Sequence, residues 1–221
     1  MKLLAVETAT EACSAALLID ENVYARFELA PRAHAQRILP MIDAVLAEAG
    51  LGLGALDAIA FGRGPGSFTG VRIAAGVVQG LAFGADLPVV PVSTLLALAE
   101  GAHRRTGARQ VAAAIDARMD EVYWACFSRQ AGDWQERVAE AVVKPGEIVV
   151  PEGAGWYGAG SGWESYAESL SSRFGDRLHA IENAYPDARD IAVLGGAAAE
   201  RGEALPAEAA LPVYLRDKVV S

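Results

Sequence analysis

The sequence contains few residues of the kinds that form cross-links and metal sites. It has two cysteines, Cys13 and Cys126, and three histidines, His34, His103 and His179, among 221 residues. Two thiols are too few for a disulfide framework or a four-thiolate metal site. The histidines stand apart, and no His-x-x-x-His, Cys-x-x-Cys or His-Glu-x-x-His pattern occurs. We therefore expect a reducing, cytosolic setting, two buried thiols and no metal site.

Positive charge and long apolar runs are also scarce. The 19 Lys and Arg against 28 Asp and Glu give a net charge of −9, so the surface as a whole repels nucleic-acid phosphates and acidic lipids. The longest uncharged apolar runs, 73–85 and 87–99, fall short of the roughly 20 residues that cross a bilayer. An acidic residue at Glu7 comes too early for a signal peptide. The sequence predicts neither unaided nucleic-acid binding, nor a membrane span, nor export.

Hydrophobic residues are abundant, at 52%, and support a folded core. A chain of this length favours two small domains. In the first half, apolar periodicity predicts a three-stranded antiparallel meander at residues 2–7, 13–19 and 23–29. Helices at 33–49, 67–83 and 94–105 then alternate with strands at 56–61 and 89–92. Ser93 is the expected cap of the last helix, and Pro40 kinks or restarts the first.

The pattern starts again after residue 106. Strands are expected at 111–116, 122–127, 138–143 and 154–157, and helices at 163–174 and 187–201. Sliding the chain by 109 residues superimposes Val6-Glu7 on Ile115-Asp116, so an acidic residue ends the first strand of each half. We predict a duplicated α/β protein with domains 1–106 and 107–221, in which the last segment can return to the N-terminal domain.

A glycine-rich loop at 62–72 lies between a predicted strand and a predicted helix. Glycines allow close backbone approach, and the start of a helix attracts anions. The loop lacks the Gly-Lys-Ser/Thr of a Walker A motif and the spacing of a dinucleotide loop. Two interpretations remain: a phosphate site at Gly64, Gly66 and Ser67, or a tight turn capped by Ser67 or Thr69.

The helix after this loop carries Gly76, Gly80 and Gly84 at a spacing of four. Each glycine costs a helix about 1 kcal/mol relative to alanine, so the row indicates a packing requirement. Small residues let another backbone approach closely. The row packs either against a partner helix or against the chain's own sheet.

The turns at residues 7–10 and 116–119 lie where a duplicated ATPase would hold phosphates and metal. Here Glu7 replaces the short carboxylate expected of such a turn, Ala9 replaces its glycine, and the second turn has Arg118 and no glycine. Ser67 is not part of a nucleophile elbow. The residues therefore predict no catalytic group. His34, near the start of a helix, is expected to be exposed or at an interface.

Six segments closely resemble the TsaB family, also called YeaZ, of the TsaD and Kae-like superfamily: residues 4–14, 34–40, 62–73, 92–95, 114–124 and 212–216. The resemblance implies a duplicated actin-like fold of the ribonuclease-H-like type, as in hexokinase and Hsp70. It also implies a non-catalytic subunit needed to form N6-threonylcarbamoyladenosine in tRNAs that read codons beginning with A. The implied partners are the transferase TsaD, as a heterodimer, and the ATPase TsaE. The tRNA is contacted through the complex, and the subunit alone forms a homodimer.

The resemblance also assigns sites. TsaD-family members carry two metal-binding histidines four residues apart, and this sequence has Thr94 and Leu98 in their places. The implied partner surface comprises the helices at 34–49 and 67–83, with His34, Arg37, Ile38, Met41, Val45, Arg72, Gly76, Gly80 and Phe83. ATP or ADP at the partner contact would touch the Gly64–Gly66 turn. The alternative functions are a stand-alone actin-like ATPase or kinase, and a glycoprotease-like peptidase.

Overall fold

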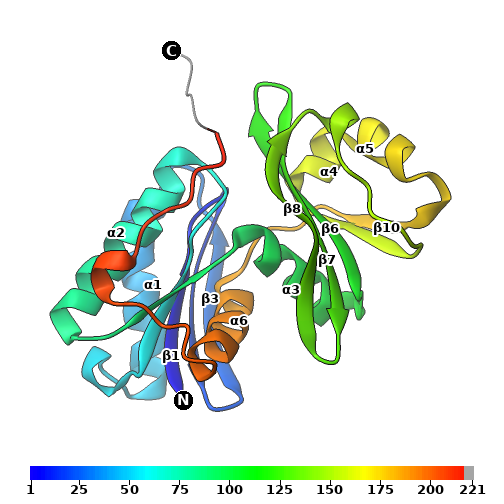
Figure 1. Cartoon of the computed structure of the whole chain (residues 1–221). Coiled ribbons are helices and arrows are strands. Elements are labelled where there is room, and N and C mark those ends of the chain that lie inside the picture. Colours follow the sequence, from blue (N-terminus) through cyan, green and yellow to red (C-terminus); the bar gives the residue numbers. More distant parts are fainter. Residues whose placement is uncertain (217–221) are drawn as a thin grey trace. The chain divides into compact units, whose positions relative to one another are not determined.

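The computed structural model describes residues 1–216, which form two compact units (Figure 1). Unit 1 comprises Met1–Ala97 and Pro186–Val213, and unit 2 comprises Leu98–Tyr185 and the described residues from Tyr214 onward. The predicted division after residue 106 lies at the end of helix α3 (Thr94–Thr106), whereas the chain passes between the units within that helix. Each unit is built around one five-stranded sheet.

The sheet of unit 1 has the strand order β3-β2-β1-β4-β5. Its strands are β1 (Lys2–Glu7), β2 (Ala12–Ile19), β3 (Asn22–Leu29), β4 (Ala58–Gly62) and β5 (Val89–Val92). The first three form the predicted antiparallel meander, and β4 and β5 join it in parallel. This arrangement brings the end of β1 beside the end of β4, where the glycine-rich loop begins.

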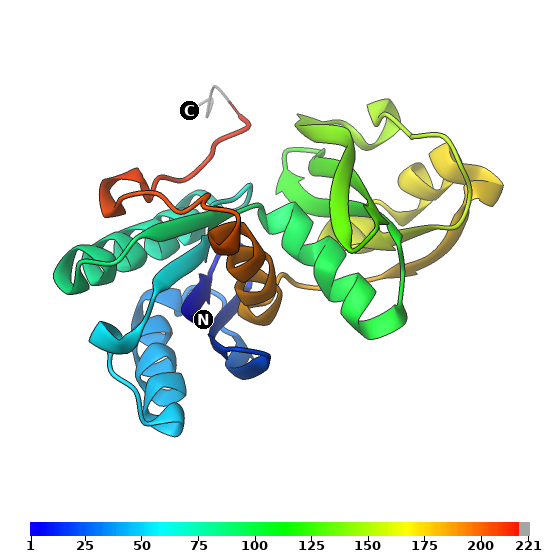
Figure 2. The same cartoon turned by 60° about the horizontal axis from the view of Figure 1, so that its bottom comes forward.

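Helices cover both faces of this sheet, because its strands are apolar on both sides. Leu4 and Val6 face a core shared with α1 (His34–Ala49) and α2 (Phe68–Ala85). Leu3 and Ala5 face a second core, shared with α6 (Ala188–Glu200). Figure 2 shows α6 on the face of the sheet opposite α1 and α2. The segment 186–213, near the other end of the chain, thus covers one face of a sheet whose first strand begins at Lys2.

Unit 2 repeats the topology of unit 1, which confirms the predicted duplication. Its strands are β6 (Gln110–Arg118), β7 (Glu121–Gln130), β8 (Asp133–Val143), β9 (Trp156–Ala159) and β10 (Leu178–Glu182), in the order β10-β9-β6-β7-β8. Again the first three are antiparallel and the last two parallel. Between β8 and β9, where unit 1 has α1, the chain forms only the short turn η2 (Pro145–Glu147). The loss of a helix explains why the second copy is hard to recognise in the sequence.

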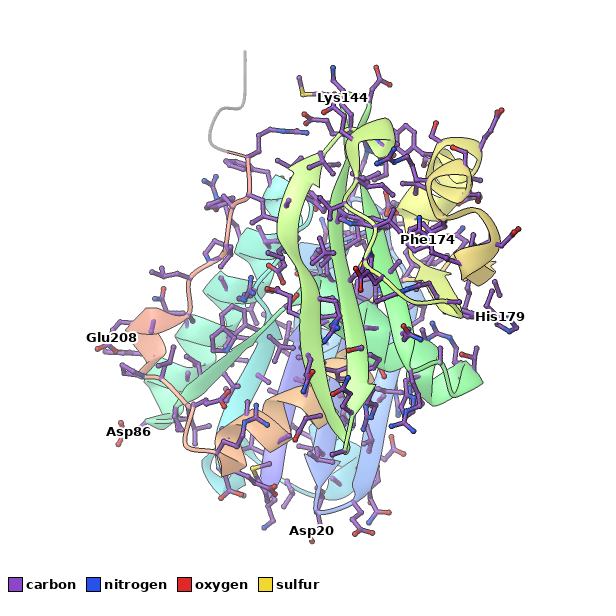
Figure 3. The ribbon with its side chains drawn as sticks, turned by 45° about the vertical axis from the view of Figure 1, so that its right-hand side comes forward. Asp20, Asp86, Lys144, Phe174, His179 and Glu208 are labelled. Carbon is purple, nitrogen blue, oxygen red and sulfur yellow. The ribbon has the colours of Figure 1, made fainter. Side chains whose placement is uncertain are left out.

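Three predictions for unit 2 need correction. Strand β8 begins at Asp133 instead of residue 138, and β10 was not predicted. The helix expected at 163–174 is two helices, α4 (Ser161–Ser165) and α5 (Ala167–Phe174), because Tyr166 has the non-helical φ and ψ of −132° and 33°. The break lets Trp163 and Phe174 meet in the core, with ring centroids 5.7 Å apart. Figure 3 labels Phe174 in this aromatic cluster.

Helix α2 combines length with an apolar composition. Its 18 residues are long and apolar enough to cross a membrane by length and composition alone, the single such helix among residues 1–216. In the fold it packs Val71, Ala74 and Val78 into the core of unit 1. Only 33% of the helix is buried, however. Much of its apolar surface therefore stays uncovered by the rest of unit 1.

Candidate functional site

The glycine-rich loop packs directly on the turn that follows β1. A Cβ added at Gly62 would lie 1.9 Å from Glu7 Oε2, one at Gly66 would lie 2.5 Å from the Ala9 oxygen, and one at Gly70 would lie 2.1 Å from the Thr8 oxygen. Real side-chain carbons do not approach other atoms so closely. Glycine is required at Gly66 and Gly70 because backbone oxygens lie against them, and at Gly62 because the Glu7 carboxyl group does. Packing inside unit 1 therefore accounts for the glycine-rich motif.

The three residues predicted to bind phosphate lie together but are engaged by their own unit. The Ser67 N–H donates to the Ala9 oxygen at 2.7 Å, and the Gly64 oxygen accepts from the Thr94 N–H at 3.0 Å. Ser67 Oγ accepts from the Gly70 N–H at 3.2 Å, which confirms Ser67 as the cap of α2. The space beside Gly64 and Gly66 is taken by backbone oxygens. The Ser67 N–H, one of the donors that a bound phosphate would need, is therefore already used inside unit 1.

Glu7, at the end of β1, is fully buried. Its Oε1 accepts from the Ala9 N–H at 2.5 Å, and its Oε2 accepts from the Thr94 hydroxyl at 3.3 Å. Burial raises the pKa of Glu7 from 4.5 to about 7, because the ionised form loses its water; these two hydrogen bonds act in the opposite direction. The carboxyl group links β1 to the start of α3 and has no surface on which to hold a nucleotide.

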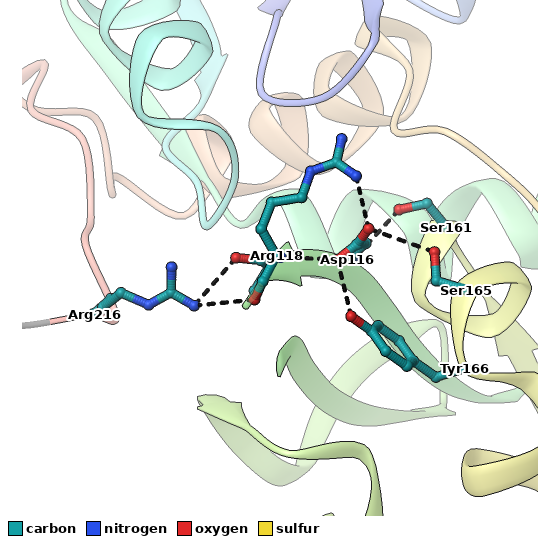
Figure 4. Close-up of polar contacts among 7 residues, drawn as sticks. Asp116, Arg118, Ser161, Ser165, Tyr166 and Arg216 are labelled. Atoms are coloured by element: carbon teal, nitrogen blue, oxygen red, sulfur yellow. Dashed lines mark hydrogen bonds and ion pairs between the residues drawn. The ribbon is translucent and has the colours of Figure 1, made fainter. Parts of the chain in front are cut away.

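Asp116, the counterpart of Glu7 in unit 2, lies in a polar cluster (Figure 4). Its Oδ2 accepts from Arg118 Nη1 at 2.8 Å and from the Ser165 hydroxyl at 3.5 Å. Its Oδ1 accepts from the Arg118 N–H at 2.8 Å and from the Tyr166 hydroxyl at 3.5 Å. Arg118 thus pairs with the carboxylate that, in a phosphate-binding turn, would be needed to hold a metal ion. Sequence reasoning missed Ser165 and Tyr166, because no local pattern links residues some 50 positions apart.

The turn between β6 and β7 has an unusual backbone. Arg118, Met119 and Asp120 have φ values of 60°, 57° and 57°, a left-handed conformation that costs roughly 1–2 kcal/mol for each residue other than glycine. Arg216 holds this turn by donating to the Ala117 oxygen at 3.1 Å and by pairing with Glu121. Arg216, the last residue that the structure describes, thus supports a strained hairpin.

The glycine row of α2 faces away from unit 1. A Cβ added at Gly76, Gly80 or Gly84 would meet no atom of the described chain within 4 Å. Packing against the chain's own sheet, one of the two predicted explanations of the row, is therefore wrong. Phe83 beside it is 82% exposed, and Arg72 is exposed with its guanidinium carbon 3.4 Å from the centre of the Phe68 ring. The row and its neighbours form an uncovered face.

Helix α1 contributes less to this face than predicted. Ile38, Met41 and Val45 are buried in the core. His34 is also buried, so of its two predicted settings, exposed or at an interface, the exposed one is wrong. The physical reason is helical spacing, which places these residues on one side of α1. Arg37 is exposed and makes two hydrogen bonds to Glu28, of 2.5 and 2.7 Å.

Metal-ligating groups do not gather anywhere in residues 1–216: no cluster of three or more His, Cys, Asp or Glu there could hold an ion. At the two positions where TsaD-family members would carry metal-binding histidines, Thr94 bonds to Glu7 and Leu98 is buried. Leucine has no ligand atom. Cys13 and Cys126 are buried free thiols, as predicted.

Comparison with known proteins identifies the family. The family model of TsaD, tRNA N6-adenosine threonylcarbamoyltransferase, matches residues 26–221. The tRNA threonylcarbamoyladenosine biosynthesis protein TsaB of Escherichia coli (strain K12) is 48% identical over 224 residues, which cover 99% of this chain and 96% of that protein. The chain belongs to the TsaB family.

Other TsaB-family proteins agree. TsaB of Haemophilus influenzae is 43% identical, over 99% of this chain and 95% of that protein. The structure of YeaZ from Pseudomonas aeruginosa superimposes with a TM-score of 0.91 and 53% identity, covering 97% of this chain and 99% of that one. These likenesses confirm the resemblance that the sequence motifs indicated and the two-unit α/β fold.

Proposed function

We propose that this TsaB-family chain is a non-catalytic subunit needed for N6-threonylcarbamoyladenosine formation in tRNA. It forms a heterodimer with the transferase TsaD, is joined by the ATPase TsaE, and acts in the cytoplasm. The names of the relatives support the pathway. The net charge of −9 supports contact with tRNA through the complex, since this surface on its own repels phosphates.

The exposed glycine row of α2 is the observation that carries the proposal. Three helical glycines cost unit 1 about 3 kcal/mol relative to alanine. No described atom lies close enough to require them. We infer that their benefit comes from outside the described residues, and close approach of another helix backbone supplies it. The partner face on α2 comprises Arg72, Gly76, Gly80 and Phe83.

TsaD fits this face because its family model also matches this chain. A partner with a related fold would present a helix equivalent to α2, and two such helices pair about a pseudo-twofold axis. We further propose that a second copy of this chain occupies the same face when TsaD is absent, forming a homodimer. A nucleotide at the partner contact stays a prediction, as does its contact with Gly64, Gly66 and Ser67; the Ser67 N–H is already bonded to the Ala9 oxygen.

The two turns that would serve an ATPase support the proposed non-catalytic role. Glu7 is buried and tied to Thr94, and Asp116 is paired with Arg118. Leu98 takes a place where the TsaD family has a metal ligand. Each feature removes a group that phosphoryl transfer or metal-assisted chemistry needs. ATP turnover by the purified chain would instead favour the stand-alone ATPase.

Mixing the purified chain with TsaD tests the proposal by size-exclusion chromatography with light scattering. We expect one heterodimer peak, and loss of that peak for Gly80→Leu, whose side chain would hold the partner backbone away. Gly146→Leu is the matched control, since Gly146 is also without neighbours within 4 Å but lies in unit 2. Separate peaks for the wild-type proteins, or equal binding by both variants, would contradict the proposal.

The alanine variants Gly76→Ala and Gly80→Ala separate folding from binding. Each should raise the free energy of unfolding by up to about 1 kcal/mol, because alanine favours the helix and meets no neighbour. Each should nevertheless weaken the complex with TsaD. Measured on the same samples, thermal unfolding should show higher stability and the binding assay should show lower affinity for TsaD.

A further inference from the structure

After α6 the chain forms a strap, residues 205–213, that lies along the edge of unit 1. Leu205 and Val89 exchange two backbone hydrogen bonds, of 2.7 and 2.8 Å. The turn η4 (Ala207–Ala209) packs on α2, with Gln79 Nε2 donating to the Glu208 oxygen at 3.4 Å. The Val213 N–H then donates to the Arg63 oxygen at 2.8 Å. Backbone hydrogen bonds therefore anchor the strap at both ends, and a hydrogen bond from the Gln79 side chain holds its middle.

The strap runs antiparallel to α2 and directly beside it. It meets Gln79 through Glu208 and reaches Arg63, before the start of the helix, at Val213. Figures 1 and 2 both show this red segment alongside α2, and Figure 3 labels Glu208 on it.

Leu211 is the most exposed large apolar residue of the strap, ahead of Leu205, which is 40% exposed. Leu211 is 62% exposed, whereas Ala210 before it is 2% exposed in the core. Its own N–H donates to the Ala209 oxygen at 2.8 Å, and Val213 is fixed two residues later. The backbone thus holds an exposed leucine in place between two anchors. Such preorganisation lowers the entropy cost of binding.

The strap lies next to the partner face of α2. Gln79, which the strap contacts, shares one side of the helix with Arg72 seven residues before it and Phe83 four residues after it. This side adjoins the row of Gly76 and Gly80, which follow Arg72 at steps of four. The surface is therefore continuous from the glycine row, across Arg72 and Phe83, to the strap.

The area that a stable complex needs indicates what the strap is for. An 18-residue helix about 27 Å long and 10 Å wide presents a footprint of about 270 Å². A specific interface buries about 800 Å² on each partner. The face of α2 has to be extended, and the strap extends it with an exposed leucine. We propose that the strap, through Leu211, forms part of the surface that binds TsaD; this inference rests on the proposed function.

Affinity for TsaD, measured by biolayer interferometry with the full-length chain, tests the role of Leu211. We expect Leu211→Glu to weaken binding at least tenfold and Leu211→Met to stay within twofold of the wild type, because methionine keeps the apolar contact. Val149→Glu is the matched control: Val149 is 64% exposed and lies in unit 2. We expect it to bind as the wild type does.

Hydrogen exchange at Val213 shows whether the strap keeps its position on unit 1 in the variants. Its N–H should keep the same protection in Leu211→Glu as in the wild type, since that hydrogen bond is made by the backbone. Binding of Leu211→Glu within twofold of the wild type, while Gly80→Leu abolishes binding, would overturn the role of the strap and leave the proposed function standing. Weaker binding accompanied by lost protection at Val213 would also overturn a direct role of Leu211. Absence of any wild-type complex would overturn the proposed function instead.

Discussion

The Gly62→Ala variant probes why the motif after β4 is rich in glycine. The new Cβ would lie 1.9 Å from Glu7 Oε2 and 2.7 Å from Glu7 Cδ, so the buried carboxyl group must move. Moving it disrupts the hydrogen bonds from Ala9 and Thr94, and a buried polar group left unpaired costs about 1–3 kcal/mol. Overpacking adds a further 1–3 kcal/mol or so. We expect the free energy of unfolding to fall by about 4 kcal/mol, a large part of the 5–15 kcal/mol typical of a domain.

Urea unfolding followed by two probes localises this effect. All four tryptophans lie in unit 2, so their fluorescence reports that unit, while far-ultraviolet circular dichroism reports both. The Gly62→Ala variant should lose part of its dichroism at lower urea, ahead of the fluorescence change. Glu7→Asp in the same chain should restore at least half of the loss, because the shorter carboxyl group vacates the space.

Gly54→Ala is the control for this pair, since Gly54 lies in unit 1 and has no neighbour within 4 Å. It should change the free energy of unfolding by less than about 0.5 kcal/mol, as surface substitutions do. A loss below 1 kcal/mol in Gly62→Ala, or no recovery on adding Glu7→Asp, would refute the reasoning that close packing on Glu7 fixes this glycine.

Three further predictions concern groups elsewhere in the two units. Because the pKa of Glu7 is about 7 when folded and near 4.5 when unfolded, the contribution of Glu7 to stability is greatest below pH 4.5 and falls by an amount of the order of 3 kcal/mol as the pH rises to 7. Glu7→Gln should remove this contribution to the slope in unfolding titrations measured at several pH values. Ser67→Ala should cost about 1 kcal/mol in thermal unfolding through loss of the α2 cap, and no change would show that the cap contributes nothing. Phe174→Ala should cost about 3–5 kcal/mol, seen as earlier unfolding by tryptophan fluorescence, because its ring packs against Trp124, Trp156 and Trp163; an unchanged midpoint would contradict this packing.

Local patterns in the sequence predict much of the fold. Alternating apolar residues locate the β1 to β3 meander, and serines before two helices are caps, as the bonds of Ser67 and Ser93 confirm. The acidic residues at the ends of β1 and β6 reveal the duplication. Strand β10 escapes prediction because five residues with alternating burial carry too little periodic signal.

The site could be predicted only in part, because its contacts join distant segments. The sequence shows that the glycines must serve a purpose, but it does not show which of them meet Glu7, Thr8 and Ala9 some 55 to 62 residues away. The family resemblance implies an interface role for Ile38 and Met41, and the apolar side of α1 has the same spacing whether it faces a core or a partner; in the structure both residues are buried in the core. In contrast, the sequence shows that the glycine row of α2 lowers the stability of the helix, but only the structure shows that the row is exposed.

The division of unit 1 into two chain segments has a consequence for its synthesis. The first strand pairs within the first twenty residues, but the helix that covers its second face, α6, begins at Ala188, whose N–H donates to Ser14 Oγ at 2.9 Å across 174 residues. On a ribosome adding 5–20 residues per second, the nascent sheet waits roughly ten seconds or more with that apolar face open. The segment that forms most of unit 2 has emerged completely before α6 can cover the sheet of unit 1. Unit 1 therefore begins to fold first and finishes last.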